Sequence, residues 1–354
     1  MYKIIDVATN FVLKYMVIIY HEREYTNMKK LVLKTLAFIS IFAAVSATVA
    51  YADFSDMPED QIARTALETA VENKLLTGYE TGEIKPYNNI KRAEMAAIIV
   101  RAFGAESNAD ISNFADMNQS QWYYDVMSKS VAMGVFQGDG TNLNPESNIT
   151  YQEAFAVLAR VFDMQTNYDV ELLKYRLNLI SERPTEKFTV LNNFADGTAV
   201  AEWAKPTTTA ILEGGYWNPA DSMIRPTEPI TRVNFALLMN NIVTTYINEP
   251  GTYDSLPQGN VLVRSNNVVI NSFDCSTANI FVGDGVKGVT TLGDGVNVDK
   301  LVVRGGNTSL NGTYNLVRII GHNCITDISK GPTVKIQLYS KYDDSVFSVG
   351  VAGV

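Results

Sequence analysis

The chain is poor in the residues on which several common chemistries depend. Its 354 residues include two cysteines and two histidines, and the formal net charge is −9. Two cysteines exclude a disulfide-stapled fold and a Cys–His zinc cluster, and two histidines leave little basis for histidine catalysis. The shortage of basic residues argues against a nucleic-acid partner, which needs a positive surface. The sequence also lacks a P-loop, a dinucleotide-binding glycine motif and a Gly-x-Ser-x-Gly elbow. We therefore expect no cofactor, no metal and no catalytic residue.

The first 52 residues have the pattern of a leader with a signal peptide. Three lysines follow Met28, the expected true start, and an apolar run covers residues 36–50. Ala50 and Ala52 then place small residues before Asp53, as signal peptidase requires. A membrane anchor is the alternative, but the run is shorter than the roughly 20 residues that cross a bilayer. We therefore expect a secreted protein with no stable membrane span in its mature form.

Charge divides the rest of the chain into two parts. Removal of residues 1–52, which hold three acidic and six basic residues, leaves a net charge of −12. Residues 250–354 hold eight acidic and eight basic residues, so the whole excess of negative charge lies in residues 53–249. The composition changes at the same place, because helical spacing of apolar residues gives way to short runs rich in valine, asparagine, glycine and threonine.

Two sequence patterns occur three times in the acidic part. The first is Phe-x-Asp, at residues 54–56, 114–116 and 194–196. The second is a five-residue segment that starts with isoleucine, at residues 90–94, 149–153 and 230–234, and we call it the box. It begins 35 or 36 residues after the start of Phe-x-Asp, and a proline stands four residues before it. Apolar spacing predicts a helix on each side of a glycine-rich loop in every copy. Units this small cannot bury their apolar faces alone, so we expect the three copies to pack together.

This threefold pattern resembles the S-layer homology (SLH) family over roughly residues 53–249. The resemblance implies a three-lobed pseudo-trimer in which the second helices form a central bundle. It also implies binding of secondary cell-wall polysaccharide, often pyruvylated, in grooves between the lobes. In the family the arginine of the box contacts the anionic sugar, and that position holds Arg92 in copy one and Arg232 in copy three. Copy two differs, because Tyr151 stands where the other copies have this arginine. Its groove either lacks the charged contact or uses the tyrosine ring to stack on a sugar.

The candidate polysaccharide-binding residues lie in the boxes and at the starts of the first helices; they are Arg92, Arg232, Lys91, Glu94, Tyr151, Glu153, Trp122 and Trp203. The planar guanidinium of arginine can form two charge-assisted hydrogen bonds with a sugar carboxylate, near backbone donors of a helix N-terminus. Because a net charge of −12 repels an anionic polymer at long range, these contacts must act locally. Two alternatives stay open. Arg92 either binds the sugar or only pairs with an acid such as Glu94. The tryptophans either fill the core, which is the favoured position, or stack on sugar rings.

The second part reads as an all-β domain. Short alternating runs occur at residues 261–263, 279–282, 301–303 and 334–338. An offset of 40 residues aligns the first run with the third, and the second falls halfway between them. This spacing predicts about five rungs of about 20 residues in a short parallel β-solenoid. An antiparallel sandwich is the alternative.

A few side chains of the β part suggest chemistry. Carboxylates that could bind calcium or take part in acid–base catalysis are present at Asp274, Asp284, Asp294 and Asp299. Turn positions are the favoured interpretation for Asp284 and Asp294, which each stand between two glycines. His322 and Cys324 would share a strand face, and ordinary packing is favoured over a Cys–His pair. Cys275 and Cys324 form one disulfide or remain free thiols.

We therefore predict an α + β multidomain chain with a leader over 1–52, repeats over 53–112, 113–193 (with a helical insertion) and 194–249, and a β domain over 250–354. The expected protein is a non-enzymatic component of the bacterial cell envelope or S-layer, anchored non-covalently to wall polysaccharide, with the β domain as a displayed or structural module. Self-assembly at the cell surface is a further expectation. The alternative function is a wall-anchored polysaccharide lyase or hydrolase with the β-solenoid as catalyst.

Overall fold

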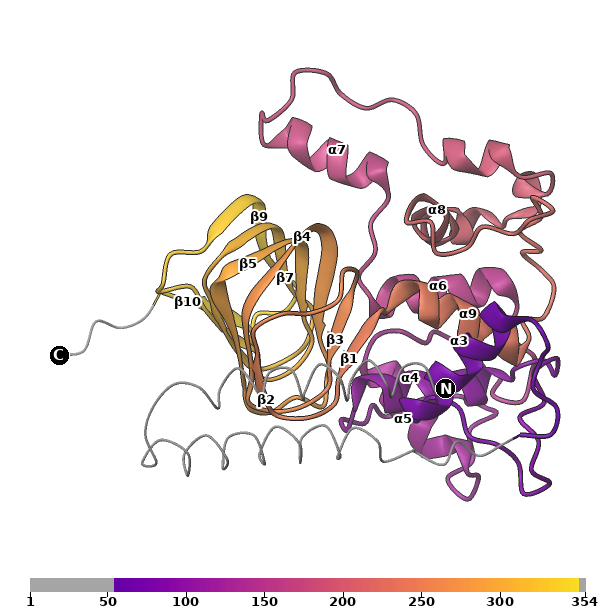
Figure 1. Cartoon of the computed structure of the whole chain (residues 1–354). Coiled ribbons are helices and arrows are strands. Elements are labelled where there is room, and N and C mark those ends of the chain that lie inside the picture. Colours follow the sequence, from indigo (N-terminus) through magenta and orange to yellow (C-terminus); the bar gives the residue numbers. More distant parts are fainter. Residues whose placement is uncertain (1–53, 350–354) are drawn as a thin grey trace, which may run out of the picture. The chain divides into compact units, whose positions relative to one another are not determined.

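The computed structural model describes residues 54–349 (Figure 1). The predicted leader and signal peptide lie outside the described residues, and the limits of the individual repeats stay predictions. Helices fill the first part of the described chain: α3 (Gln61–Glu72), α4 (Arg92–Phe103), α5 (Tyr123–Ala132), α6 (Tyr151–Val161), α7 (Asn167–Arg176), α8 (Lys205–Glu213) and α9 (Arg232–Ile242), with 3₁₀ turns η1 (Thr189–Asn193), η2 (Gly197–Ala199) and η3 (Glu202–Ala204). Within residues 54–349, none of the helices combines the length and apolar character needed to cross a bilayer.

Helices α4, α6 and α9 begin at the three boxes. Their first turns are closed by local hydrogen bonds, since the backbone N–H of Lys91 donates to Glu94 over 2.8 Å and that of Thr150 donates to Glu153 over 2.9 Å. In the third copy the side chain of Thr231 accepts from the N–H of Asn234. These bonds satisfy donors that a helix start leaves free, which explains why polar residues recur at these positions.

Three backbone hydrogen bonds close the copies into a ring. The N–H of Ile90 donates to the carbonyl of Ile230 over 3.0 Å, that of Ile230 to Ile149 over 3.0 Å, and that of Ile149 to Ile90 over 2.9 Å. All three isoleucine side chains are fully buried. Because each copy donates to one neighbour and accepts from the other, the arrangement has pseudo-threefold symmetry.

The repeated prolines belong to the same ring. The N–H of the residue after each arginine or tyrosine of the box donates to the proline carbonyl of the next copy; these pairs are Ala93–Pro145, Gln152–Pro226 and Val233–Pro86, at 2.9, 3.0 and 2.8 Å. The first helices interlock the copies further, because α5 packs on α4, α8 on α6 and α3 on α9. Each first helix therefore covers the second helix of a neighbouring copy.

The second part is a parallel β-solenoid (Figure 1). Along one side, parallel pairing runs through β1 (Thr245–Ile247), β3 (Val261–Val263), β4 (Val268–Val282), β5 (Val289–Val303), β7 (Thr313–Ile319) and β9 (Thr333–Ser340). Along the other it runs through β2 (Gly251–Tyr253), β4, β5, β6 (Asn307–Leu310), β8 (Ile325–Asp327) and β10 (Val346–Ser348). Leu262 lies beside Phe281, and Phe281 beside Val302, so the predicted rungs and about five turns are confirmed. Parallel pairing excludes the antiparallel sandwich.

One face of the solenoid joins the hydrophobic core of the helices, while the solenoid interior forms a core of its own. Leu262, Phe281, Val302 and Ile320 are buried in the same cluster as the residues of the helices. The rings of Phe281 and Phe162 meet edge to face with centroids 4.9 Å apart. From Phe54 onward, the described residues accordingly form a single compact unit.

Polar side chains of the solenoid also cap the carboxyl ends of the helices. Arg264 donates to the carbonyls of Asn73 and Arg101, at the ends of α3 and α4, over 2.9 and 3.1 Å. Arg304 donates to Met133 O, after α5, over 2.9 Å, and to Val161 O, the last residue of α6, over 3.4 Å. Such carbonyls lack partners within their own helix and carry the negative end of its dipole, so a cation stabilises them.

Arg304 is neutralised by Asp284, which the sequence favoured as a simple turn residue. Its Nε lies 2.6 Å from the Asp284 carboxylate, and the Arg304 side chain is 2% exposed. The turn that holds Asp284 approaches the helical part closely, because the N–H of Gly285 donates to Phe103 O over 2.8 Å. A Cβ atom on Gly285 would lie 2.4 Å from the carbonyl oxygen of Gly104, so only glycine fits there.

Arg304→Ala should lower the free energy of unfolding by about 3 kcal/mol, because it leaves the largely buried carboxylate of Asp284 without its partner and two helix ends uncapped. Lys287→Ala is the matched control, since it removes the exposed pair with Glu106 from the same junction. Chemical denaturation followed by circular dichroism measures both. Equal effects of the two substitutions would contradict a structural role for the buried pair.

Candidate functional site

The two box arginines occupy equivalent positions between copies. Arg92 donates from Nε to Leu143 O over 2.9 Å and from a terminal nitrogen to Gln137 O over 3.0 Å, both in copy two. Arg232 makes the same two bonds to copy one, with Ile84 O and Thr77 O, each over 2.8 Å. The side chains are nearly buried, at 8% and 6% exposure of the residue. Each arginine therefore joins two copies.

The acid that pairs with Arg92 is Glu153 of copy two, 3.0 Å away. Glu94, the partner considered from the sequence, instead turns back to the N–H of Lys91. Lys91 is exposed and pairs with Glu146, and this hydrogen bond raises the pKa of its ammonium group. Of these charged candidates, the structure brings together Arg92 and Glu153.

A cavity of about 610 Å³ lies beside Arg92. We call it the Arg92 groove; its lining includes Phe136, Asp139, Glu153, Arg160 and Trp203. Copy one thus supplies Arg92, copy two the loop and helix α6, and copy three the indole of Trp203. The site exists only when three copies assemble.

The favoured core position of the tryptophans is wrong. Trp122 is 57% exposed and Trp203 is 54% exposed. Trp122 is the residue just before α5, and Trp203 lies in the 3₁₀ turn η3 just before α8. The buried positions of α5, among them Tyr123 and Met127, come after Trp122. The repeated tryptophan is therefore outside the stripe that packs on the neighbouring helix. Its ring is free to contact a ligand.

A second arginine in each groove was missed by the sequence reasoning. Arg160 lines the Arg92 groove, and Arg101 is its equivalent near Arg232. Burial, with the like charge of Arg92, lowers the pKa of Arg160. Burial, with the like charge of Arg232, lowers the pKa of Arg101. The Arg92 groove also holds the carboxylates of Glu153 and Asp139, and Glu153 pairs with Arg92. Within the described residues, Arg160 and Arg101 have no carboxylate partner, so these second arginines are the cations that remain available to an anion.

Helical geometry explains how one helix supplies two grooves. Arg101 follows Arg92 by nine residues on α4, about two and a half turns, so the two side chains lie on opposite faces. Arg92 faces copy two and Arg101 faces copy three. The nine-residue spacing was visible in the sequence, but which neighbour covers each face was not.

The groove of Tyr151 is filled by its own side chains. Tyr151 is 4% exposed, and its ring lies 5.2 Å from the ring of Trp217 in copy three. Its hydroxyl accepts a hydrogen bond from Asn234. Asn241 stands where the other grooves have their second arginine. This groove therefore lacks both cations, and the tyrosine ring packs between copies.

The candidate residues of the solenoid are engaged elsewhere or exposed. Asp274 and Asp299 accept hydrogen bonds from asparagines on neighbouring rungs, and Asp294 is exposed. Cys275 and Cys324 are free thiols in the described part of the chain. Burial raises the pKa of the Cys324 thiol to about 11, and its Sγ donates to the backbone of His322. A thiol held in this way is not an activated nucleophile. Within residues 54–349, no group of three acidic, histidine or cysteine side chains could hold a metal.

Comparison with known proteins identifies the first two copies. The family model of the S-layer homology domain matches residues 53–96 and 113–155. The chain is similar to the surface-layer 125 kDa protein of Lysinibacillus sphaericus, with 26% identity over 236 residues that cover 65% of this chain and 17% of that protein. It is also similar to the cellulosome-anchoring protein of Acetivibrio thermocellus, with 27% identity over 193 residues that cover 52% of this chain and 39% of that protein.

An enzyme is among the similar proteins as well. Exoglucanase XynX of Acetivibrio thermocellus is 22% identical over 191 residues, which cover 54% of this chain and 16% of the enzyme. The chain thus spans well under half of each of these relatives. The S-layer homology domains predicted in copies one and two are confirmed, and such domains indicate anchoring at the cell surface.

Copy three lies outside the matched segments, and its assignment as an S-layer homology repeat stays a prediction. Its geometry follows the other two. The carboxylate of Asp196 accepts from the N–H groups of Ile224 and Arg225 over 2.8 and 2.7 Å. Asp56 and Asp116 each accept in the same way from two successive N–H groups in their own copies. The aspartate of Phe-x-Asp thus ties the start of each copy to its loop.

Asp196→Ala should cost about 2–3 kcal/mol of unfolding free energy, because two backbone donors lose a charged acceptor. Asp116→Ala, in a matched repeat, should cost about the same. Asp221→Ala removes an exposed carboxylate of copy three and is the control. Urea unfolding of the three variants makes the comparison. A cost for Asp196→Ala near that of the control would show that copy three is not built like the others.

Proposed function

We propose that the chain attaches non-covalently to anionic secondary cell-wall polysaccharide through two of its three grooves. The observation that carries the proposal is the pairing of arginines. Arg160 lines the cavity beside Arg92 and Arg101 lies close to Arg232, each without a carboxylate partner among the described residues, whereas Tyr151 packs on Trp217 at the equivalent position. The protein is then a secreted component of the cell envelope.

The chemistry of the grooves suits an acidic sugar, and a pyruvylated one is the proposed ligand. Arg92 and Arg232 already donate to carbonyls, so they are held rigidly and lose little freedom on binding. Within the described residues, Arg160 and Arg101 each donate to one backbone carbonyl, which leaves their other donors free for a carboxylate. The exposed tryptophan offers a flat apolar face for a sugar ring. Binding rests on these local contacts because the part that carries the grooves is acidic overall.

The solenoid is proposed as a structural module that is carried with the anchor. It covers helix ends and contributes to the shared core, which argues for a fixed position on the helices. The names of the surface-layer and cellulosome-anchoring relatives support attachment at the cell surface. Self-assembly remains an expectation. A wall-anchored hydrolase is the less favoured function, because Asp274, Asp284 and Asp299 are occupied by hydrogen bonds or an ion pair.

The double variant Arg101→Gln/Arg160→Gln should lose wall binding by at least about tenfold in Kd, since each groove loses a charge-assisted donor. These arginines are preferred to Arg92 and Arg232, whose removal would also break bonds between copies. The measurement is co-sedimentation of the full chain with purified cell walls, before and after chemical removal of the polysaccharide. Circular dichroism checks that the variant is folded.

Arg225→Gln is the matched control, because Arg225 lies in copy three, next to the filled Tyr151 groove, and pairs with Asp221. It should pellet like the unmodified chain. Full pelleting of the double variant, or undiminished binding to stripped walls, would overturn the proposed function.

A further inference from the structure

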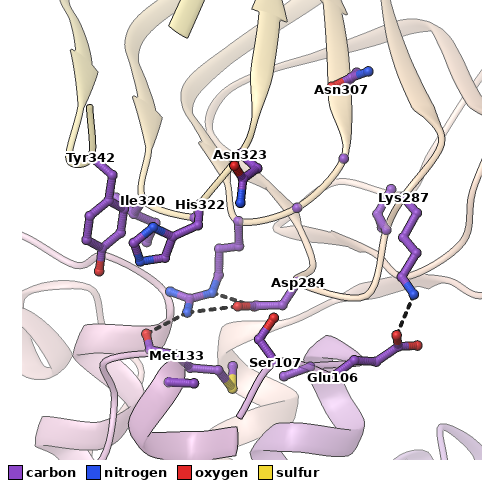
Figure 2. A pocket seen from close by; sticks show the side chains of 17 residues that line it. Glu106, Ser107, Met133, Asp284, Lys287, Asn307, Ile320, His322, Asn323 and Tyr342 are labelled. Carbon is purple, nitrogen blue, oxygen red and sulfur yellow. Dashed lines mark hydrogen bonds and ion pairs between the residues drawn. The ribbon is translucent and has the colours of Figure 1, made fainter. Parts of the chain in front are cut away.

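A second cavity, of about 570 Å³, opens where the helical part meets the solenoid. Figure 2 shows Glu106 and Ser107 on the helical side, and His322, Asn323 and Tyr342 on the turns of the solenoid. We call this cavity the junction cleft. It shares no lining residue with the Arg92 groove. Its chemistry must therefore be considered separately from that of the anionic wall polymer.

The charged side chains that line the junction cleft are paired. Asp284 is bound to Arg304, which is itself nearly buried, and Lys287 is bound to Glu106. The Nδ1 atom of His322 lies 2.9 Å from a carboxylate oxygen of Asp344. Because each of these carboxylates already has a partner, and Lys287 and Arg304 are the paired cations of the described lining, the lining presents no unpaired charge that would select an ionic ligand. The ammonium group of Lys341 lies outside this lining, 4.9 Å from the centroid of the Tyr342 ring.

What the cleft offers is a rigid ring face beside uncharged polar groups. The rings of His322 and Tyr342 stack with centroids 3.7 Å apart and planes inclined by 23°, and they lie next to each other in Figure 2. The bond to Asp344 fixes the histidine ring. Within residues 54–349, the side-chain amide of Asn323 and the hydroxyl of Tyr342 have no hydrogen-bond partner in the protein. Both are therefore available to a ligand.

Apolar side chains complete the lining. Ala132, Val286 and Ile320 border the cleft between the polar groups. Flat rings, neutral amide and hydroxyl groups, and small apolar patches together match the surface of an uncharged sugar that bears a methyl-ended amide. We propose that the junction cleft binds an uncharged oligosaccharide of N-acetylhexosamine units. The binding site is formed jointly by the loop after α4 and the solenoid turns.

The test uses chitotetraose, an uncharged tetramer of N-acetylglucosamine, and the full chain. Isothermal titration should show saturable binding. Tyr342→Ala and Asn323→Gly should each weaken it by at least about tenfold. Glycine is chosen at position 323 because Asn323 has a φ of 54°, which glycine adopts without strain. Tyr175→Ala, at an exposed tyrosine on α7 that lies outside the junction cleft, should leave the affinity unchanged.

The result separates this site from the proposed wall-binding grooves. Arg101→Gln/Arg160→Gln should bind chitotetraose like the unmodified chain, and Tyr342→Ala should still pellet with cell walls. Thermal unfolding checks both cleft variants, and one folded variant suffices for the test. Absence of saturable binding, undiminished binding by a folded cleft variant, or loss of binding in the arginine variant would each overturn the proposal.

Discussion

The helical part depends on a ring of three backbone hydrogen bonds between Ile90, Ile149 and Ile230. Backbone groups this deeply buried must find partners, and here each finds its partner in another copy. The ring makes the three copies interdependent, because the isoleucine N–H of each box finds its acceptor in another copy. It also explains the sequence, since the isoleucine, the proline before it and the polar cap after it all serve this closure. The grooves are a consequence of the closure, as each is bounded by residues of different copies.

The same geometry that forms the grooves also holds their arginines in fixed positions. Arg92 and Arg232 stabilise the contacts between copies, so they are held in place whether or not a ligand is bound. The solenoid adds to this rigidity by capping the ends of the helices and by sharing their core. An anchor of this kind resists movement between its parts. The proposed binding sites are therefore preformed, and little ordering of side chains would accompany binding.

Much of the architecture was predictable from spacing. The repeats, their helix–loop–helix form and the parallel rungs all follow from periodicity, which reports local structure and the stacking of like units. The surroundings of single side chains did not follow. Trp122 and Trp203 were favoured as core residues, but a tryptophan in the first turn lies outside the packed stripe. Arg101 and Arg160 were missed because the sequence does not say which neighbour meets each face of a helix. The pairing of Asp284 with Arg304 depends on contacts between rungs, which a turn motif does not reveal.

The three tryptophans of the chain offer one direct test, because each reports on a different groove. Trp203 lies in the Arg92 groove, Trp217 packs on Tyr151, and Trp122, which precedes α5 on α4, falls by the pseudo-threefold relation beside the groove of Arg232. The measurement is the shift of their indole N–H signals in a two-dimensional NMR spectrum as solubilised wall polysaccharide is added. The account predicts that the signals of Trp203 and Trp122 move while that of Trp217 stays. Equal shifts of all three signals, or a shift of Trp217 alone, would contradict it.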